Sequence, residues 1–198
     1  MKDLIIIDST SSKKTLKTLT SSNSDEHNTP SYLIEAARTV MGGIDLDPMS
    51  NLIANNTINA SDIYTKEDNG LTKDWYGRVW LNPPFSLSKL AIPKLIKSYE
   101  SGKVTQAVLL VKSDVSTQKY KLLYPYPFCE LDKRVKFENT SNKDSSPFPV
   151  VMFYLGHDFY KWNLVMSKLG KVHLGNELTL ALLDCCSSTY KRVIGVIE

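Results

Sequence analysis

The four residues Asn82-Pro83-Pro84-Phe85 have the types needed to transfer a methyl group to an amine conjugated to a planar ring. The nitrogen of such an amine, for instance N6 of adenine, is a poor nucleophile because its lone pair is delocalised into the ring. Two neutral acceptors, the side-chain oxygen of Asn82 and the carbonyl oxygen of Pro83, can each accept one N–H and favour a pyramidal nitrogen whose lone pair points at a methyl donor. Phe85 offers a face on which a flipped base stacks, worth about 1–3 kcal/mol.

A short apolar strand must position this motif. Val79, Trp80 and Leu81 read as a buried strand, and the two prolines that follow Asn82 cannot donate to a sheet ladder, so the strand ends there. In open α/β sheets, ligands bind at the carboxyl ends of the strands. The alternative is a polyproline-like turn between a strand and a helix, but the apolar strand before the motif and the aromatic residue after it favour a functional site.

A second group of polar residues follows another predicted strand, residues 44–48. Its alternation places Asp45 and Asp47 on one side. An acidic residue at the carboxyl end of such a strand holds ribose hydroxyls in dinucleotide-type folds, which makes Asp47 the first candidate for cofactor binding and Asp45 the second. The alternative is that Asp47 only initiates a turn before Pro48. Upstream, Thr29 as N-cap and Pro30 as first helical residue predict a helix that ends near Gly42.

These motifs together resemble a known family. The residues that carry the resemblance are Thr29-Pro30, Ile44-Asp45-Leu46-Asp47-Pro48-Met49-Ser50, Asn55, Asp68-Asn69-Gly70-Leu71, Asp74-Trp75 and Val79 to Ser86. In order and spacing they are similar to the small phage-type DNA N-6-adenine methyltransferase (Dam) family over roughly residues 27–160.

The resemblance implies an α/β fold, a Rossmann-like class I methyltransferase sheet that is mostly parallel with a late antiparallel hairpin. It implies that S-adenosyl-L-methionine donates the methyl group to a flipped adenine in double-stranded DNA. Asn82, Pro83, Pro84 and Phe85 are then the expected catalytic residues. Thr29, Pro30 and Asp68 join the two earlier aspartates as expected cofactor contacts, although an ordinary cap and a plain turn also account for these three.

Two departures from the wider superfamily accompany the resemblance. No Phe-x-Gly-x-Gly loop follows a first strand, and Gly42-Gly43 is a poor substitute for it, so the residues that replace the glycine loop are not identified. Phe85 stands where tyrosine is commoner, which keeps the stacking face and loses a hydroxyl.

Two other functions are compatible with the motif. A protein methyltransferase would present the same groups to a glutamine side-chain amide, and methyl transfer from a labelled donor to protein alone would identify it. A degenerate DNA-binding relic would bind DNA and show no heat on titration with S-adenosyl-L-methionine. The missing glycine loop and Asp74-Trp75 favour the DNA family over the first alternative, and the intact residues 82–85 argue against the second.

Length and composition set the frame for these predictions. The 198 residues suit one domain, predicted over 28–198, after a mobile Ser/Thr-rich tail at 1–27. A net charge of +3 permits nucleic-acid binding without arguing for it. Cys129, Cys185 and Cys186 lack metal-ligand spacing, so we expect free thiols, no metal site and a cytoplasmic location. No apolar run approaches the ~18 residues of a membrane span, and the sequence does not indicate the oligomeric state.

The remaining pattern completes the predicted sheet. Residues 87–100 predict a helix with Leu90, Leu95 and Ile96 inward, and the continuous apolar run in 105–111 predicts a strand buried on both faces. Lys112-Ser113-Asp114 then falls on the same edge as Asn82 and is a candidate lining of the base pocket. Residues 134–137 and 150–154 predict the late hairpin. The loop 139–146 between them is interpreted as a solvated tip, and the alternative is that it reaches over DNA with Lys143.

Overall fold

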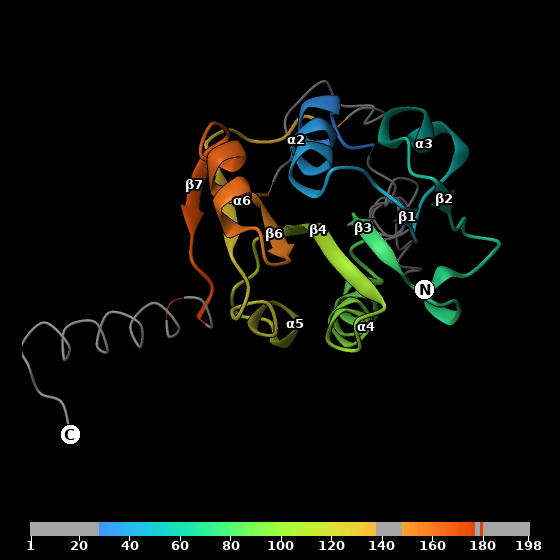
Figure 1. Cartoon of the computed structure of the whole chain (residues 1–198). Helices are drawn as coiled ribbons and strands as arrows, with labels where there is room; N and C mark the ends of the chain where they lie inside the picture. The colour runs from blue at the N-terminus through green and yellow to red at the C-terminus, as the bar shows by residue number, and fades with distance from the viewer. Residues whose placement is uncertain (1–27, 138–147, 177–178, 180–198) are drawn as a thin grey trace, which may run out of the picture.

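The computed structural model describes residues 28–137, 148–176 and 179 (Figure 1). The predicted tail at 1–27, the hairpin tip at 139–146, Cys185 and Cys186 lie outside these residues. Within them, none of the helices is long and apolar enough to cross a membrane.

The described residues form one seven-stranded sheet with the order β2-β1-β3-β4-β6-β5-β7. The strands are β1 (Leu46–Asp47), β2 (Asp62–Ile63), β3 (Gly77–Leu81), β4 (Val104–Lys112), β5 (Phe128–Leu131), β6 (Val150–Leu155) and β7 (Gly170–His173). The first four in spatial order pair in parallel, whereas β6 is antiparallel to β4 and β5, and β7 is antiparallel to β5. This arrangement confirms the predicted α/β, Rossmann-like methyltransferase sheet with its antiparallel end.

The predicted hairpin is half correct. Strand β6 confirms the prediction for 150–154, but residues 134–137 form no strand, and the strands that pair with β6 are β4 and β5. Val135 and Phe137 are nevertheless buried while Lys136 is exposed. The alternation of apolar and basic residues therefore indicates an extended segment that packs on the core. The antiparallel position beside β6 that was predicted for this segment is instead occupied by β5, which comes earlier in the chain.

Helices cover both faces of the sheet. They are α2 (Ser31–Met41), α3 (Leu52–Ile58), the short 3-10 helix η1 (Gly70–Thr72), α4 (Ser88–Glu100), α5 (Gln118–Lys121) and α6 (Phe159–Met166). Figure 1 shows α2 and α6 on one side of the sheet and α4 and α5 on the other. Each parallel strand therefore ends at a sheet edge flanked by helices, where a ligand can be enclosed.

Alternate residues of the central strands enter two separate cores. Trp80, Val108 and Leu110 belong to the core under α2 and α6. Val79 and Leu109 belong to the core over α4. The continuous apolar run of β4 is explained by burial on both faces, which confirms the prediction for this strand.

Two local predictions about the helices need correction. Thr29 is not the N-cap of α2: Pro30 occupies that position and no side chain caps the helix, whereas Gly42 ends it in the left-handed conformation with φ 78° as predicted. In α4 the buried stripe falls on Ser88, Ala91, Ile92 and Leu95, which leaves Leu90 56% exposed. The stripe is one face of a 3.6-residue helix, and the predicted inward residue Leu90 lies outside it.

Candidate active site

A pocket of about 390 Å³ lies at the carboxyl ends of β1 and β3, on the side of the sheet that α2 and α3 cover. This volume is within the range of small-molecule sites. Its lining includes Asn28, Thr29, Asp47 to Asn51, Ala54, Ile58, Thr65, Lys66, Asn69 to Leu71, Trp80 and Asn82 to Leu87. The pocket is thus built from the segments that follow three neighbouring parallel strands, β2, β1 and β3, and from the segment before α2.

Strand β3 presents Asn82 at one end of this pocket. Two residues earlier, Trp80 lines the same pocket because alternate residues of a strand share a face. The side-chain nitrogen Nδ2 of Asn82 donates a hydrogen bond to Oγ1 of Thr29 across 3.0 Å, and Thr29 is only 5% exposed. This bond fixes the rotation of the Asn82 carboxamide, because a planar amide with its nitrogen committed to one partner has its oxygen at a defined position.

The turn after Asn82 is held by hydrogen bonds to its carbonyl groups. The N–H of Leu87 donates to the carbonyl oxygen of Pro84 at 2.9 Å, and the hydroxyl of Ser88 donates to the carbonyl oxygen of Phe85 at 2.7 Å. The Phe85 ring meets Phe148 edge to face, with centroids 4.7 Å apart and an interplanar angle of 85°. The first turn of α4 and an aromatic neighbour thus fix where Phe85 lies.

Asp47 is a buried carboxylate in the pocket lining. It is 2% exposed and accepts the N–H of Met49 at 3.2 Å. Burial raises the pKa of Asp47 to about 6, against the lowering effects of the Ser50 hydroxyl and the Met49 N–H. None of the ion pairs between residues that the structure describes includes Asp47. A buried anion in a ligand-sized pocket favours a positively charged ligand group.

One further polar atom of the pocket lining, Nε1 of Trp80, is buried without a hydrogen-bond partner in the described part of the chain. Buried polar groups are normally paired, so unpaired ones in a pocket lining indicate a place where a ligand supplies the partners.

The opposite wall of the pocket is formed by η1 and the turn before it. The indole Nε1 of Trp75 donates to the carbonyl oxygen of Gly70 at 2.8 Å, and a Cβ on Gly70 would collide with the carbonyl oxygen of Pro48. Asp68 does not line the pocket; its carboxylate accepts the N–H and hydroxyl of Thr65 at 2.8 and 2.9 Å. The hydrogen bonds from Thr65 lower the pKa of Asp68, which therefore stabilises the turn as an anion.

Asp45 also lies outside the pocket lining. Its Oδ2 accepts the backbone N–H of Arg78 at 2.8 Å and the side-chain Nε of Arg78 at 2.9 Å. These contacts lower the pKa of Asp45, chiefly through the side-chain hydrogen bond. The pair links the start of β1 to β3, so the carboxylate that the sequence made the second cofactor candidate is committed to a structural contact.

The structure therefore brings together some of the predicted site residues and separates others. The predicted residues that line the pocket are Thr29, Asp47, Asn82, Pro83, Pro84 and Phe85. Pro30, Asp45 and Asp68 do not line it, and neither does the predicted group Lys112-Ser113-Asp114.

Sequence reasoning missed Trp80 and Ser50 as pocket residues. Trp80 had a usable signal, since it precedes Asn82 by two residues in a strand. Ser50 had none, because a serine after a turn is ordinary. Among the described residues, no group of His, Cys, Asp or Glu side chains is placed to hold a metal ion.

The family model described as DNA N-6-adenine-methyltransferase (Dam) matches residues 16–143 of this chain. The matched segment includes the pocket residues that follow β1, β2 and β3. No curated protein sequence matches the chain.

Proposed function

The chain belongs to the DNA N-6-adenine-methyltransferase (Dam) family, and from this premise we propose that it transfers a methyl group from S-adenosyl-L-methionine to N6 of an adenine flipped out of double-stranded DNA. One observation carries the proposal. A fixed carboxamide, Asn82, and a buried carboxylate without a cationic partner in the described residues, Asp47, line the same pocket. The first suits a nucleobase amine and the second suits a cationic donor.

Asn82 and Pro83 are the proposed acceptors for the two hydrogens of the amine. As these hydrogens are drawn toward the Asn82 side-chain oxygen and the Pro83 carbonyl oxygen, the N6 lone pair leaves conjugation with the ring and becomes available to form the new nitrogen–carbon bond. As this bond forms, the sulfur–methyl bond of the donor breaks and the donor leaves as a neutral thioether. The methylated amine then passes one proton to water and reaches its neutral form. Thr29 positions the carboxamide by holding its nitrogen.

Phe85 is the proposed stacking surface for the base. Its ring is held by Phe148, and its carbonyl oxygen by the hydroxyl of Ser88, which is 3% exposed. A pre-positioned ring reduces the ordering entropy that a flipped base must overcome on binding. Pro83 and Pro84 act through rigidity, since each fixes its own φ and restricts the residue before it.

The pocket residues fit a sulfonium methyl donor. S-adenosyl-L-methionine supplies an electrophilic methyl group on a positively charged sulfur. Asp47 would hold a positively charged part of this molecule, and the Trp80 N–H, which has no partner among the described residues, is available for one of its polar groups. Gly70, which lies against the carbonyl oxygen of Pro48, would form a wall of the same part of the pocket.

The experiment incubates the full chain with S-adenosyl-L-methionine carrying a labelled methyl group, once with unmethylated double-stranded DNA and once with a protein extract. We expect label in the DNA and none in the protein. Label in protein alone would replace the proposal with glutamine-amide methylation. Calorimetric titration with the donor is run in parallel, because a chain that binds DNA but gives no heat with the donor is a DNA-binding relic.

A further inference from the structure

Four exposed lysines lie along one edge of the sheet, the edge at which β3 ends and Asn82 follows it. They are Lys112, Lys133, Lys136 and Lys168, and they are called the lysine row below. The whole chain has a net charge of only +3, so a concentration of cations at one edge is not a consequence of overall charge.

Strand register places the row on this edge. Lys112, the last residue of β4, pairs with Val150 of β6, and Leu131, the last residue of β5, pairs with Gly170 of β7. Lys133 and Lys136 follow Leu131 in the chain, and Lys168 precedes Gly170. The N–H of Asp132 donates to the carbonyl oxygen of Leu169 at 3.1 Å, which brings the segments of Lys133 and Lys168 side by side.

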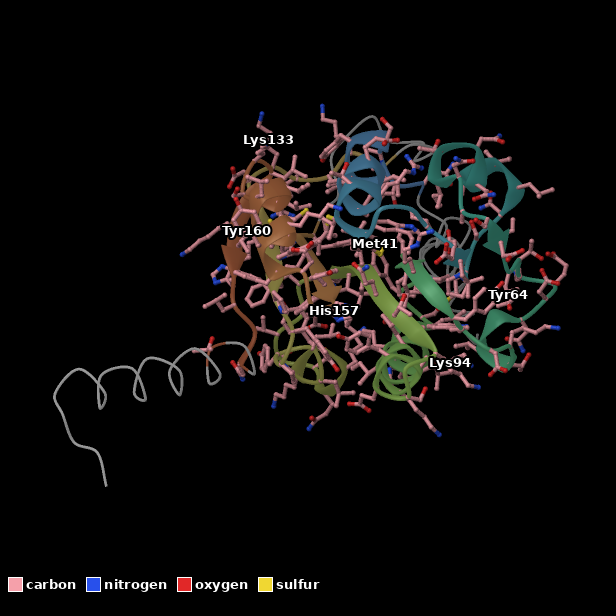
Figure 2. All side chains as sticks on the ribbon, viewed as in Figure 1. Met41, Tyr64, Lys94, Lys133, His157 and Tyr160 are labelled. Carbon is pink, nitrogen blue, oxygen red and sulfur yellow. The ribbon has the colours of Figure 1, made fainter. Side chains whose placement is uncertain are left out.

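The row begins next to the proposed base site. The ammonium of Lys112 lies over the ring of Phe148, 5.2 Å from its centroid, and Phe148 contacts Phe85. From Lys112 at the end of β4 the row extends to the start of β7. The distance between these two strands is three strand spacings, or about 14 Å. Figure 2 shows Lys133 at one margin of the molecule and Lys94, on α4, at the opposite margin.

The charges of the row are not neutralised by ion pairs within the described residues. The carboxylates in those pairs are Glu35, Asp45, Asp74 and Glu130, and their partners are other side chains. Asp114, Asp132 and Glu138 are the acidic residues nearest in sequence; Glu138 lies outside the described residues, and Asp114 accepts the hydroxyl of Ser116 at 3.0 Å.

We propose that the lysine row binds the phosphates of the duplex on one side of the flipped adenine, so that the DNA lies along the edge from Phe85 toward β7. The inference rests on the proposed function and adds where the duplex docks. One strand carries a phosphate about every 3.4 Å, so a row of about 14 Å faces about four nucleotides. Flexible lysines suit such contacts, because phosphates position the duplex and carry no sequence information.

The experiment measures the dissociation constant for a short duplex as a function of salt. Each phosphate contact contributes about 0.9 to the slope of log K against log salt, so Lys133→Gln combined with Lys168→Gln lowers the slope by about 2 and weakens binding about 30-fold at about 0.15 M salt. Adding Lys136→Gln lowers the slope by a further unit. Methyl transfer at saturating DNA and affinity for S-adenosyl-L-methionine stay at wild-type values.

A matched control removes the same charge from the opposite edge. Lys97 lies in the last turn of α4 and Lys161 in the first turn of α6, so Lys97→Gln combined with Lys161→Gln leaves the row intact. The control keeps the wild-type slope. Equal slopes for both double variants would overturn the docking surface while leaving methylation untouched. A wild-type chain that shows the predicted slopes yet transfers no methyl group would instead overturn the proposed function alone.

Discussion

Asn82 and Thr29 are 53 residues apart in sequence and are joined by a hydrogen bond of 3.0 Å at the wall of the pocket. The contact ties the end of β3 to the segment that leads into α2. It gives Thr29 a role that differs from the one the sequence indicated, because the hydroxyl does not cap the helix and instead holds the carboxamide proposed to bind the substrate amine.

Removing the hydroxyl of Thr29 should lower turnover, because the Asn82 carboxamide is then less well positioned. Thr29→Val keeps the shape of the side chain and removes the hydrogen bond between Thr29 and the Asn82 nitrogen, so we expect kcat to fall about tenfold, the equivalent of about 1.4 kcal/mol. Affinity for S-adenosyl-L-methionine, measured by calorimetry, should change less than about threefold. Thr29→Ser keeps the hydroxyl and is the control. A serine variant as slow as the valine variant would contradict the positioning role.

Asp47 should make the ligand-free protein less stable at high pH. Its pKa is about 6 in the folded chain against 3.8 for the ordinary group, so the folded state binds the proton more tightly than the unfolded state. The free energy of unfolding therefore falls as pH rises between these values, by about 3 kcal/mol in all. Asp47→Asn should remove this dependence and be the more stable protein at pH 8. Urea unfolding at pH 5 and pH 8 checks it, and parallel pH profiles for the two proteins would contradict it.

The same substitution should weaken binding of the methyl donor. The charged carboxylate is the form that attracts a cation, so the affinity of the wild-type chain for S-adenosyl-L-methionine should rise as pH increases through about 6. Asp47→Asn should bind the donor at least about tenfold more weakly at pH 8, with a smaller difference at pH 5. Calorimetry at the two pH values tests this, and unchanged donor affinity in the variant would remove Asp47 from the cofactor site.

Asp45 offers the contrasting case. Asp45→Asn breaks the ion pair between Asp45 and Arg78. Both side chains are about one third exposed, so we expect the free energy of unfolding to fall by about 1 kcal/mol. Donor affinity and kcat should remain at wild-type values because Asp45 does not line the pocket. Thermal unfolding and calorimetry on the same preparation measure both quantities. A loss of donor affinity comparable to that of Asp47→Asn would restore Asp45 as a cofactor ligand.

The parts of the fold that depend on local pattern were predictable. Strand β3 ends where two prolines forbid its continuation, β4 is a continuous apolar run, and α2 ends at a glycine in the left-handed conformation. Each of these features is dictated by residues within a few positions of one another.

The parts that depend on distant partners were not predictable. Alternation placed Asp45 and Asp47 on one side of a strand, but only Asp45 forms an ion pair with Arg78. No residue close to Asp45 in the sequence indicates this contact. Residues 134–137 alternate as a strand does, yet β5 takes the pairing with β6. A choice between competing strands is made by the packing of the whole sheet.

The most direct measurement of the central claim is the nucleoside composition of DNA after incubation with S-adenosyl-L-methionine and either the wild-type chain or Asn82→Ala. Mass spectrometry should find N6-methyladenine with the wild-type chain. With the variant it should find almost none, although the affinity of the variant for the donor is unchanged. N6-methyladenine at wild-type levels from the Asn82→Ala variant, or methylation of a different base by the wild-type chain, would contradict the account.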